Sequence, residues 1–175
     1  LAGYALLAGL CFRIIGPGFS SGVKVPDGFY PVRAVEILRR AGAQGNLALS
    51  FRWGGYASWG LYPGIKVSMD GRYEETYPES TFEMNERFFR KEGSDWNRLV
   101  KNYPVDFILV EKMRSYLEPA DLNALGYELI EAHPKYQLWS RPEKAALLRN
   151  IGQQLPDPLP ATHLLNASIP SAWPR

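Results

Sequence analysis

The residues best suited to chemistry lie between Asn46 and Arg72, where aromatic, glycine and charged residues are densest. Two short apolar runs, 46–51 and 65–69, are flanked by turn-forming residues and separated by a connector, 52–62, that is too long for a hairpin. We therefore predict two parallel strands joined by a crossover helix. Ligands gather beyond the carboxyl ends of parallel strands, where Phe51 to Trp53 and Asp70 to Arg72 would emerge.

Asp70 and Arg72 are the charged pair at the end of the second run. They are two positions apart, so an extended backbone directs both side chains to the same side. The pair either contacts a ligand or forms a structural ion pair that closes the strand end. Gly54 and Gly55 begin the predicted helix, where free backbone N–H groups could face an anion. The alternative is a tight turn packed under Trp53 and Trp59.

Catalytic and metal-binding motifs are missing from the sequence. It contains no Gly-x-Ser-x-Gly, His-Glu-x-x-His or Gly-x-Gly-x-x-Gly pattern. Asp70 could pair with Glu74, Glu75 or Glu111 as two carboxylates, but the spacing does not fix their separation. His133 and His163 are thirty residues apart and Cys11 is the only cysteine, which leaves zinc without a ligand set. We predict no catalytic residue, no metal and no cofactor for this chain.

Length and charge narrow the class of protein further. A chain of 175 residues is long enough for one domain that buries about 70% of its unfolded surface. The net charge is only +2, and the basic residues are scattered and do not form a stripe with interleaved aromatic residues. A nucleic-acid partner is therefore not expected.

The first fifteen residues, Leu1 to Ile15, are apolar except for Arg13. The run is shorter than the 20 or so residues that span a bilayer, and it lacks the basic leader and cleavage site of a signal peptide. It is the truncated end of a transmembrane helix, a buried helix of the domain, or a remnant of a signal region. The first is favoured because Arg13 can extend to the membrane interface and Gly16-Pro17-Gly18 would stop the helix. Residues 16–28 then form a linker.

The rest of the sequence supplies the helices and strands that must hold the carboxyl ends of the two predicted strands in place. Apolar periodicity and turn residues predict helices over 31–41, 94–103 and 119–125, and a further helix that starts at a Ser80-x-x-Glu83 capping box. They also predict a hairpin of strands 127–132 and 136–140, followed by one helical turn at 145–148. Val105 to Val110 is the clearest strand, and Glu111 and Lys112 leave its carboxyl end toward the same edge as Asp70. They are second candidates for the site.

Together these elements predict an α/β fold. Three parallel strands are extended by the antiparallel C-terminal hairpin, in a small two-layer or three-layer domain over residues 29–150. Residues 151–175 are rich in proline and low in charge, which predicts a tail.

Several spaced motifs occur in an order that resembles a known family. They are Tyr30-Pro-Val-Arg-Ala-Val-Glu-Ile-Leu38, Gly45-Asn46, Trp53-Gly-Gly-Tyr56, Ile65-Lys-Val-Ser-Met-Asp-Gly-Arg72 and Tyr103-Pro-Val-Asp-Phe-Ile-Leu-Val110. The succession resembles the C-terminal extracytoplasmic domain of bacterial polytopic membrane proteins related to C-type, lipid-phosphate-sugar-dependent glycosyltransferases. More distantly, it is similar to the soluble domain of the oligosaccharyltransferase catalytic subunit.

The resemblance implies a set of ligand-binding residues. Trp53 and Tyr56 match an acceptor-binding Trp-Trp-Asp-Tyr-Gly motif, and Asp70 matches an acid at a strand end. The first tryptophan of that motif is Arg52 here and its aspartate is a glycine, so groups expected to bind an acceptor hydroxyl are missing. With Arg72 beside Asp70, the predicted binding edge is Trp53, Tyr56, Asp70 and Arg72.

The resemblance also implies a location and a role. The chain is expected to lie on the extracytoplasmic side of the cell membrane, attached to the membrane portion of the same protein. There it would position an acceptor or cover the membrane active site, with a lipid-linked sugar or acceptor as its ligand. In such enzymes the catalytic groups lie on loops between membrane helices, so this chain alone is not expected to catalyse a reaction. The alternative is a free-standing α/β module that binds a small polar ligand or a protein partner.

Overall fold

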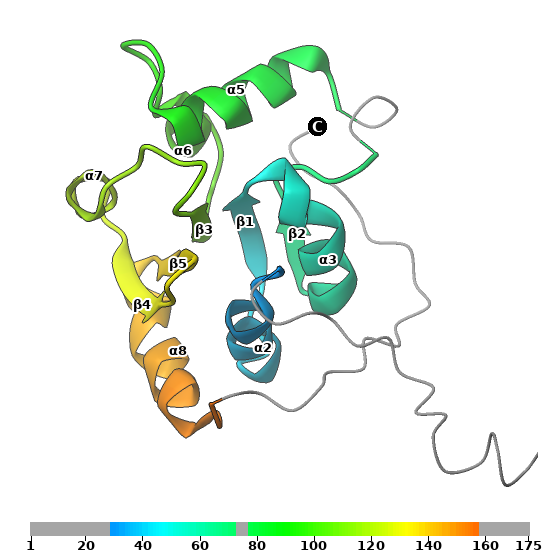
Figure 1. Ribbon diagram of the computed structural model, residues 1–175, viewed down its shortest axis with the longest axis vertical. Helices are drawn as coiled ribbons and strands as arrows, with labels where there is room; N and C mark the ends of the chain where they lie inside the picture. The colour runs from blue at the N-terminus through cyan, green and yellow to red at the C-terminus, as the bar shows by residue number, and fades with distance from the viewer. Residues whose placement is uncertain (1–28, 73–76, 158–175) are drawn as a thin grey trace, which may run out of the picture.

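A computed structural model describes residues 29–72 and 77–157 (Figure 1). The predicted membrane end at 1–15, the linker at 16–28 and the tail from residue 158 onward lie outside the described residues. Within the two described ranges, no helix has the length and apolar character needed to cross a bilayer.

A five-stranded sheet in the order β2-β1-β3-β5-β4 forms the centre of the fold. Its strands are β1 (Gly45–Leu49), β2 (Ile65–Val67), β3 (Phe107–Glu111), β4 (Glu128–Ala132) and β5 (Tyr136–Ser140). β1 runs parallel to both β2 and β3, while β5 is antiparallel to β3 and to β4. The predicted parallel sheet with an antiparallel hairpin is therefore confirmed.

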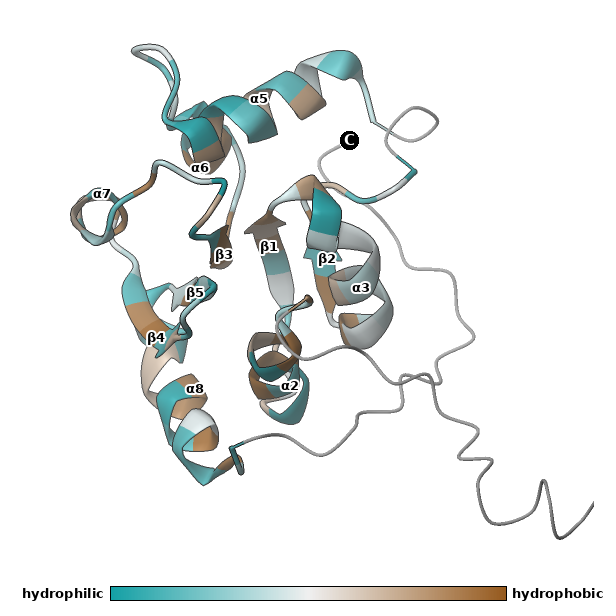
Figure 2. Ribbon diagram, viewed as in Figure 1, coloured by the Kyte–Doolittle hydropathy of each residue, from teal (hydrophilic) through white to brown (hydrophobic). Residues whose placement is uncertain are grey.

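Helices cover both faces of the sheet and make the fold three-layered. One face carries α2 (Val32–Arg40), α3 (Phe51–Leu61) and α8 (Pro142–Gln154), and the other carries α5 (Glu79–Arg90), α6 (Arg98–Asn102) and α7 (Pro119–Ala124). Because side chains alternate along a strand, Leu47 and Leu49 of β1 enter the first core and Ala48 enters the second. Figure 2 shows the corresponding stripes of apolar and polar residues on α2, α5 and α8.

Turn residues end several elements where the sequence predicts. Gly42 follows α2 and adopts a φ of 57°, and Gly126 follows α7 with a φ of 81°. These left-handed conformations suit glycine, which has no side chain to clash. The hairpin of β4 and β5 and the strand over 105–110 also form, with boundaries shifted by one or two residues.

Three local predictions are wrong in detail. Phe51 begins α3 and does not end β1. Ser80 does not cap a helix, because α5 begins at Glu79 after Pro78, and the reciprocal capping box is instead made by Glu118 and Asp121 at α7. The single turn expected at 145–148 is a helix of 13 residues, α8, that starts at a proline and continues past residue 150. Most of its apolar residues are consecutive, Ala145 to Leu148, so the sequence shows a single turn and little helical periodicity beyond it.

Candidate functional site

Trp53 belongs to the core between α2, α3 and the sheet. Its side chain is 3% exposed, and its Nε1 donates a hydrogen bond to the carbonyl oxygen of Phe29 at 3.2 Å. Its ring meets the ring of Tyr136 edge-on, with centroids 6.0 Å apart. Trp53 therefore fixes the start of the described chain against the sheet.

Tyr56, one turn further along α3, is half-buried between α3 and the start of α2. Its ring stacks on that of Tyr30 with centroids 4.8 Å apart. Burial and the nearby negative charge of Glu36 raise the pKa of Tyr56 to about 12, so its hydroxyl is neutral at physiological pH.

Asp70 and Arg72 form an ion pair in the turn after β2. Asp70 is 3% exposed, and it accepts hydrogen bonds from the backbone N and the Nε of Arg72, each at 3.0 Å. The guanidinium group also lies 2.5 Å from the second carboxylate oxygen, and its hydrogen bonds to Asp70 raise the pKa of Arg72. The two side chains are on the same side, as predicted, and they bind each other.

The four predicted site residues fall into two pairs on different sides of α3. Trp53 and Tyr56 face α2 and the hairpin, whereas Gly54 lies against the backbone of Met69 and Asp70. A Cβ atom on Gly54 would be 1.9 Å from the Met69 carbonyl oxygen. Successive residues of a helix are rotated by about 100°, so these neighbours point in different directions. Gly54 lies within α3, which begins at Phe51, and lets the helix pack closely against the backbone that follows β2.

A cleft of about 430 Å³ opens at the carboxyl ends of β1 and β3. The turn from β1 into α3, one side of α5 and the segment after β3 surround it. It is lined by Ser50, Phe51, Arg52, Phe82, Glu86, Phe89, Arg90, Arg114 and Tyr116. This is the edge that the parallel strand order favours for a ligand.

A buried carboxylate organises the inner end of the cleft. Glu111, the last residue of β3, is 6% exposed. It accepts hydrogen bonds from Ser50 Oγ at 3.0 Å and Arg52 Nη1 at 3.3 Å, and Arg114 Nε lies 3.7 Å away. One carboxylate thus holds two guanidinium groups that are themselves partly exposed to the cleft.

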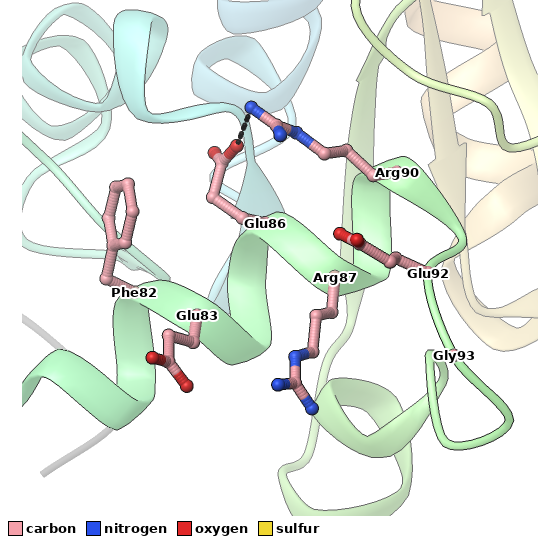
Figure 3. A pocket seen from close by; sticks show the side chains of 7 residues that line it. All are labelled: Phe82, Glu83, Glu86, Arg87, Arg90, Glu92 and Gly93. Carbon is pink, nitrogen blue, oxygen red and sulfur yellow. Dashed lines mark ion pairs between the residues drawn. The ribbon is translucent and has the colours of Figure 1, made fainter.

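Helix α5 supplies a third arginine on the opposite wall. Arg90 pairs with Glu86 at 3.1 Å, one helical turn apart. The same two residues also line a second hollow of about 480 Å³ on the outer side of α5, with Phe82, Glu83, Arg87, Glu92 and Gly93. Figure 3 shows Glu86 and Arg90 pointing toward one another, while Glu83 and Arg87 extend to the other side of the helix. Acidic residues outnumber basic ones around this second hollow.

Around the cleft, basic residues outnumber acidic ones. Three arginines surround it, against Glu86 and the buried Glu111. The first residues of α3, Phe51 and Arg52, also line it, and the start of a helix carries a partial positive charge. Guanidinium groups bind phosphate and carboxylate in a two-pronged geometry. The arrangement is suited to holding an anionic group.

Part of this site is visible in the sequence. Arg52 emerges where the first strand was expected to end, and Glu111 is a second candidate that the structure places at this edge. Sequence reasoning missed Arg90, Arg114 and Tyr116. The available signals were the spacing of four between Glu86 and Arg90, and the position of Arg114 just after the clearest strand.

No protein-family model, curated protein or solved structure was found to match the chain. A function for this chain must therefore be inferred from the residues of the cleft and their geometry.

Proposed function

We propose that this chain is an accessory domain of a membrane-embedded, glycosyltransferase-like protein, on the extracytoplasmic side of the cell membrane. In this proposal the cleft between Arg52, Arg90 and Arg114 holds the phosphate of a lipid-linked sugar or an anionic group of the acceptor. The membrane portion of the same protein carries out the chemistry. The observation that carries the proposal is the gathering of three arginines at the carboxyl ends of parallel strands.

The size and lining of the cleft support a ligand larger than a single phosphate. Its volume of about 430 Å³ lies in the range of small-molecule sites, which is about 300 to 1,000 Å³. Phe51, Phe82, Phe89 and Tyr116 contribute aromatic surface beside the arginines. Such a combination suits a ligand with one charged part and one bulky part, as in a sugar phosphate.

The four residues of the predicted binding edge have a supporting role in this proposal. Trp53 and Tyr56 hold the start of α2 against α3, and the Asp70–Arg72 pair fixes the turn behind Gly54. The contacts of Trp53 and Tyr56 and the Asp70–Arg72 pair together fix the position of the first turn of α3. That turn carries Arg52 at the cleft.

A second candidate function is a free-standing module that uses the same cleft for a small polar ligand. The observation in its favour is that helices already cover both faces of the sheet. The described residues therefore bury their two cores without any further chain.

The proposal is tested by binding to the full 175-residue chain in lipid nanodiscs. The probe is a short-chain prenyl-phosphate sugar, followed by isothermal titration calorimetry, with the free sugar and inorganic phosphate as comparisons. Arg114→Gln is expected to weaken binding of the probe roughly tenfold, because it removes a charge-assisted hydrogen bond. Arg87→Gln is the matched control, since Arg87 lines the outer hollow and not the cleft.

The outcomes separate the two candidates. Tight binding of the prenyl-phosphate sugar that is lost in Arg114→Gln but kept in Arg87→Gln supports the accessory role. Equal affinity for inorganic phosphate and for the probe favours the free-standing module. Equal losses in both variants, or no binding of any probe, would contradict a ligand in this cleft.

A further inference from the structure

Large apolar side chains are exposed around the mouth of the cleft. Among the described residues, Met113 is 87% exposed, Tyr116 is 72% exposed and Phe29 is 50% exposed. Tyr116 lines the cleft, and Met113 lies three residues before it in the same segment after β3. The Phe29 ring lies under the guanidinium group of Arg52, 4.5 Å from its centroid. All three therefore lie at the carboxyl edge of the sheet.

Basic side chains lie among these apolar ones. Arg52 and Arg114 are partly or largely exposed, and Lys112 is exposed next to Met113. The backbone of Lys135, in the turn between β4 and β5, lies beside that of Lys112, because the Lys135 carbonyl oxygen accepts a hydrogen bond from the Lys112 backbone at 3.0 Å. The edge thus combines apolar, aromatic and cationic groups.

Among the described residues, the acidic side chains near this edge are already engaged. Glu111 is buried beneath Arg52 and Arg114, and Glu86 is paired with Arg90. Glu118 caps the first turn of α7 through its side chain. The charge that the described residues leave at the surface of the edge is therefore positive.

The chain enters the described domain at this same edge. Phe29 is the first described residue, and Trp53 holds its carbonyl oxygen beside the start of α3. Thirteen residues, 16–28, separate it from the apolar run at 1–15. Thirteen residues can span no more than roughly 45 Å in any conformation. If the apolar run is held in a membrane, this edge lies within roughly 45 Å of the lipid surface.

We infer that an edge surface formed by Phe29, Arg52, Lys112, Met113, Arg114 and Tyr116 rests on an anionic lipid bilayer. Aromatic rings and lysine or arginine side chains are the residues that favour the membrane–water interface. Each basic residue near an anionic surface adds to the attraction. Met113 and Tyr116 enter the headgroup region, and the cleft then opens toward the lipid.

This inference rests on the membrane attachment in the proposed function, but not on what the cleft binds. It sets the orientation of the domain. A ligand held by a lipid chain could then reach the arginines from the membrane side without leaving the bilayer.

Leu147 on α8 provides an internal control. It is 55% exposed, so it is also a large apolar side chain at the surface. Lys144, three residues earlier, donates to the carbonyl oxygen of Gln44 and to Asp106, which precede β1 and β3. Leu147 therefore lies toward the amino ends of the parallel strands and not on the edge surface.

The test measures the depth of single sites in the full chain bound to vesicles. In a Cys11→Ser background, Met113→Cys, Tyr116→Cys and Leu147→Cys are each labelled with an environment-sensitive fluorophore. The vesicles contain phosphatidylcholine and phosphatidylglycerol, with or without a lipid that carries a quencher in its headgroup region. Because each label reports its own depth, attachment through residues 1–15 does not produce the signal by itself.

We expect a blue shift and a loss of fluorescence with quencher lipid at positions 113 and 116, and neither change at 147. Lys112→Glu combined with Arg114→Glu should restore the fluorescence of the label at 116, with circular dichroism checking the fold. Quenching at 147 that equals that at 113 and 116, or no quenching at 113 and 116 on bound vesicles, would overturn the inference. If that happens while Arg114→Gln still loses the prenyl-phosphate sugar, the orientation fails and the proposed function stands.

Discussion

The two ends of the parallel strands use charged residues in different ways. At the amino end, Asp106 accepts a hydrogen bond from the Asn46 backbone at 2.8 Å and from Lys144 Nζ at 2.5 Å, and its carbonyl oxygen accepts one from the Arg141 backbone at 3.0 Å. At the carboxyl end, Glu111 holds its arginines at 3.3 Å and 3.7 Å. Asp106 links the starts of β1 and α8, whereas Glu111 lies beside an open cleft.

The packing around each carboxylate explains the difference. Gly45 at the amino end has a φ of 134°, and a Cβ atom there would lie 2.2 Å from Asp106 Oδ2. The acid and the backbone therefore fill the space between them. At the carboxyl end the arginines come from a helix start and a loop, so part of each guanidinium group stays exposed. Lys144 at the amino end is 35% exposed and Arg52 at the carboxyl end 36%, so the two ends differ in the cleft that the arginines border and not in the exposure of these side chains.

The largest expected effect tests whether the carboxyl end is rigid as well as open. Gly54→Ala places a Cβ atom 1.9 Å from the Met69 carbonyl oxygen, so α3 must move away from β2. We expect a loss of about 3 kcal/mol or more in the free energy of unfolding, measured by urea denaturation. Gly55→Ala is the matched control, because no atom lies within 4 Å of its Cβ position. It should be neutral or stabilise by up to about 1 kcal/mol; equal effects would mean that this end packs loosely.

Asp106→Ala tests the closed end. The substitution removes the acceptor of the Asn46 N–H and one of the two acceptors of the Lys144 ammonium. We expect a loss of about 2 kcal/mol in the free energy of unfolding. Binding of the prenyl-phosphate sugar should not change, because Asp106 lies at the other end of the strands. A change in affinity with stability intact would show that the two ends are coupled.

Glu111→Gln tests the open end with a smaller effect. The amide keeps the shape of the side chain but removes one negative charge beside Arg52 and Arg114. We expect a loss of about 1 kcal/mol in the free energy of unfolding. Affinity for the prenyl-phosphate sugar should rise, on the order of fourfold, because the arginines are less neutralised. Weaker binding would assign Glu111 to the ligand itself and not to the support of the arginines.

The smallest change concerns Glu36 on α2, a buried carboxylate that, like Asp106, accepts hydrogen bonds from two residues. Burial alone would raise its pKa, but hydrogen bonds from Arg39 and Arg40 outweigh burial and lower it. Its stabilising effect is therefore present above the unfolded value of about 4.5 and is lost as the pH falls toward the folded-state pKa. Thermal unfolding between pH 7 and pH 3 should show a smaller acid-induced loss in Glu36→Gln. Equal pH profiles for the two proteins would contradict this assignment.

Residue pattern determined much of the architecture. The apolar run before Glu111 specifies a central strand, and the spacing of Ala34, Ile37 and Leu38 specifies the buried face of α2. Gly42 and Gly126 mark helix ends because few other residues adopt their backbone angles. The length of the connector between the first two strands, too long for a hairpin, specified that they run parallel. These features are local, so the sequence contains their cause.

The residues that meet at the proposed cleft were decided by the tertiary structure. Trp53 and Gly54 are neighbours in sequence, but the helical rotation between them sends one to the core with Tyr136 and the other to the backbone of Met69. Arg52, Arg90 and Arg114 come from three separate segments that meet only because the sheet order places β1 beside β3 and α5 packs above them. No spacing along the chain encodes that meeting, since it depends on how distant elements pack.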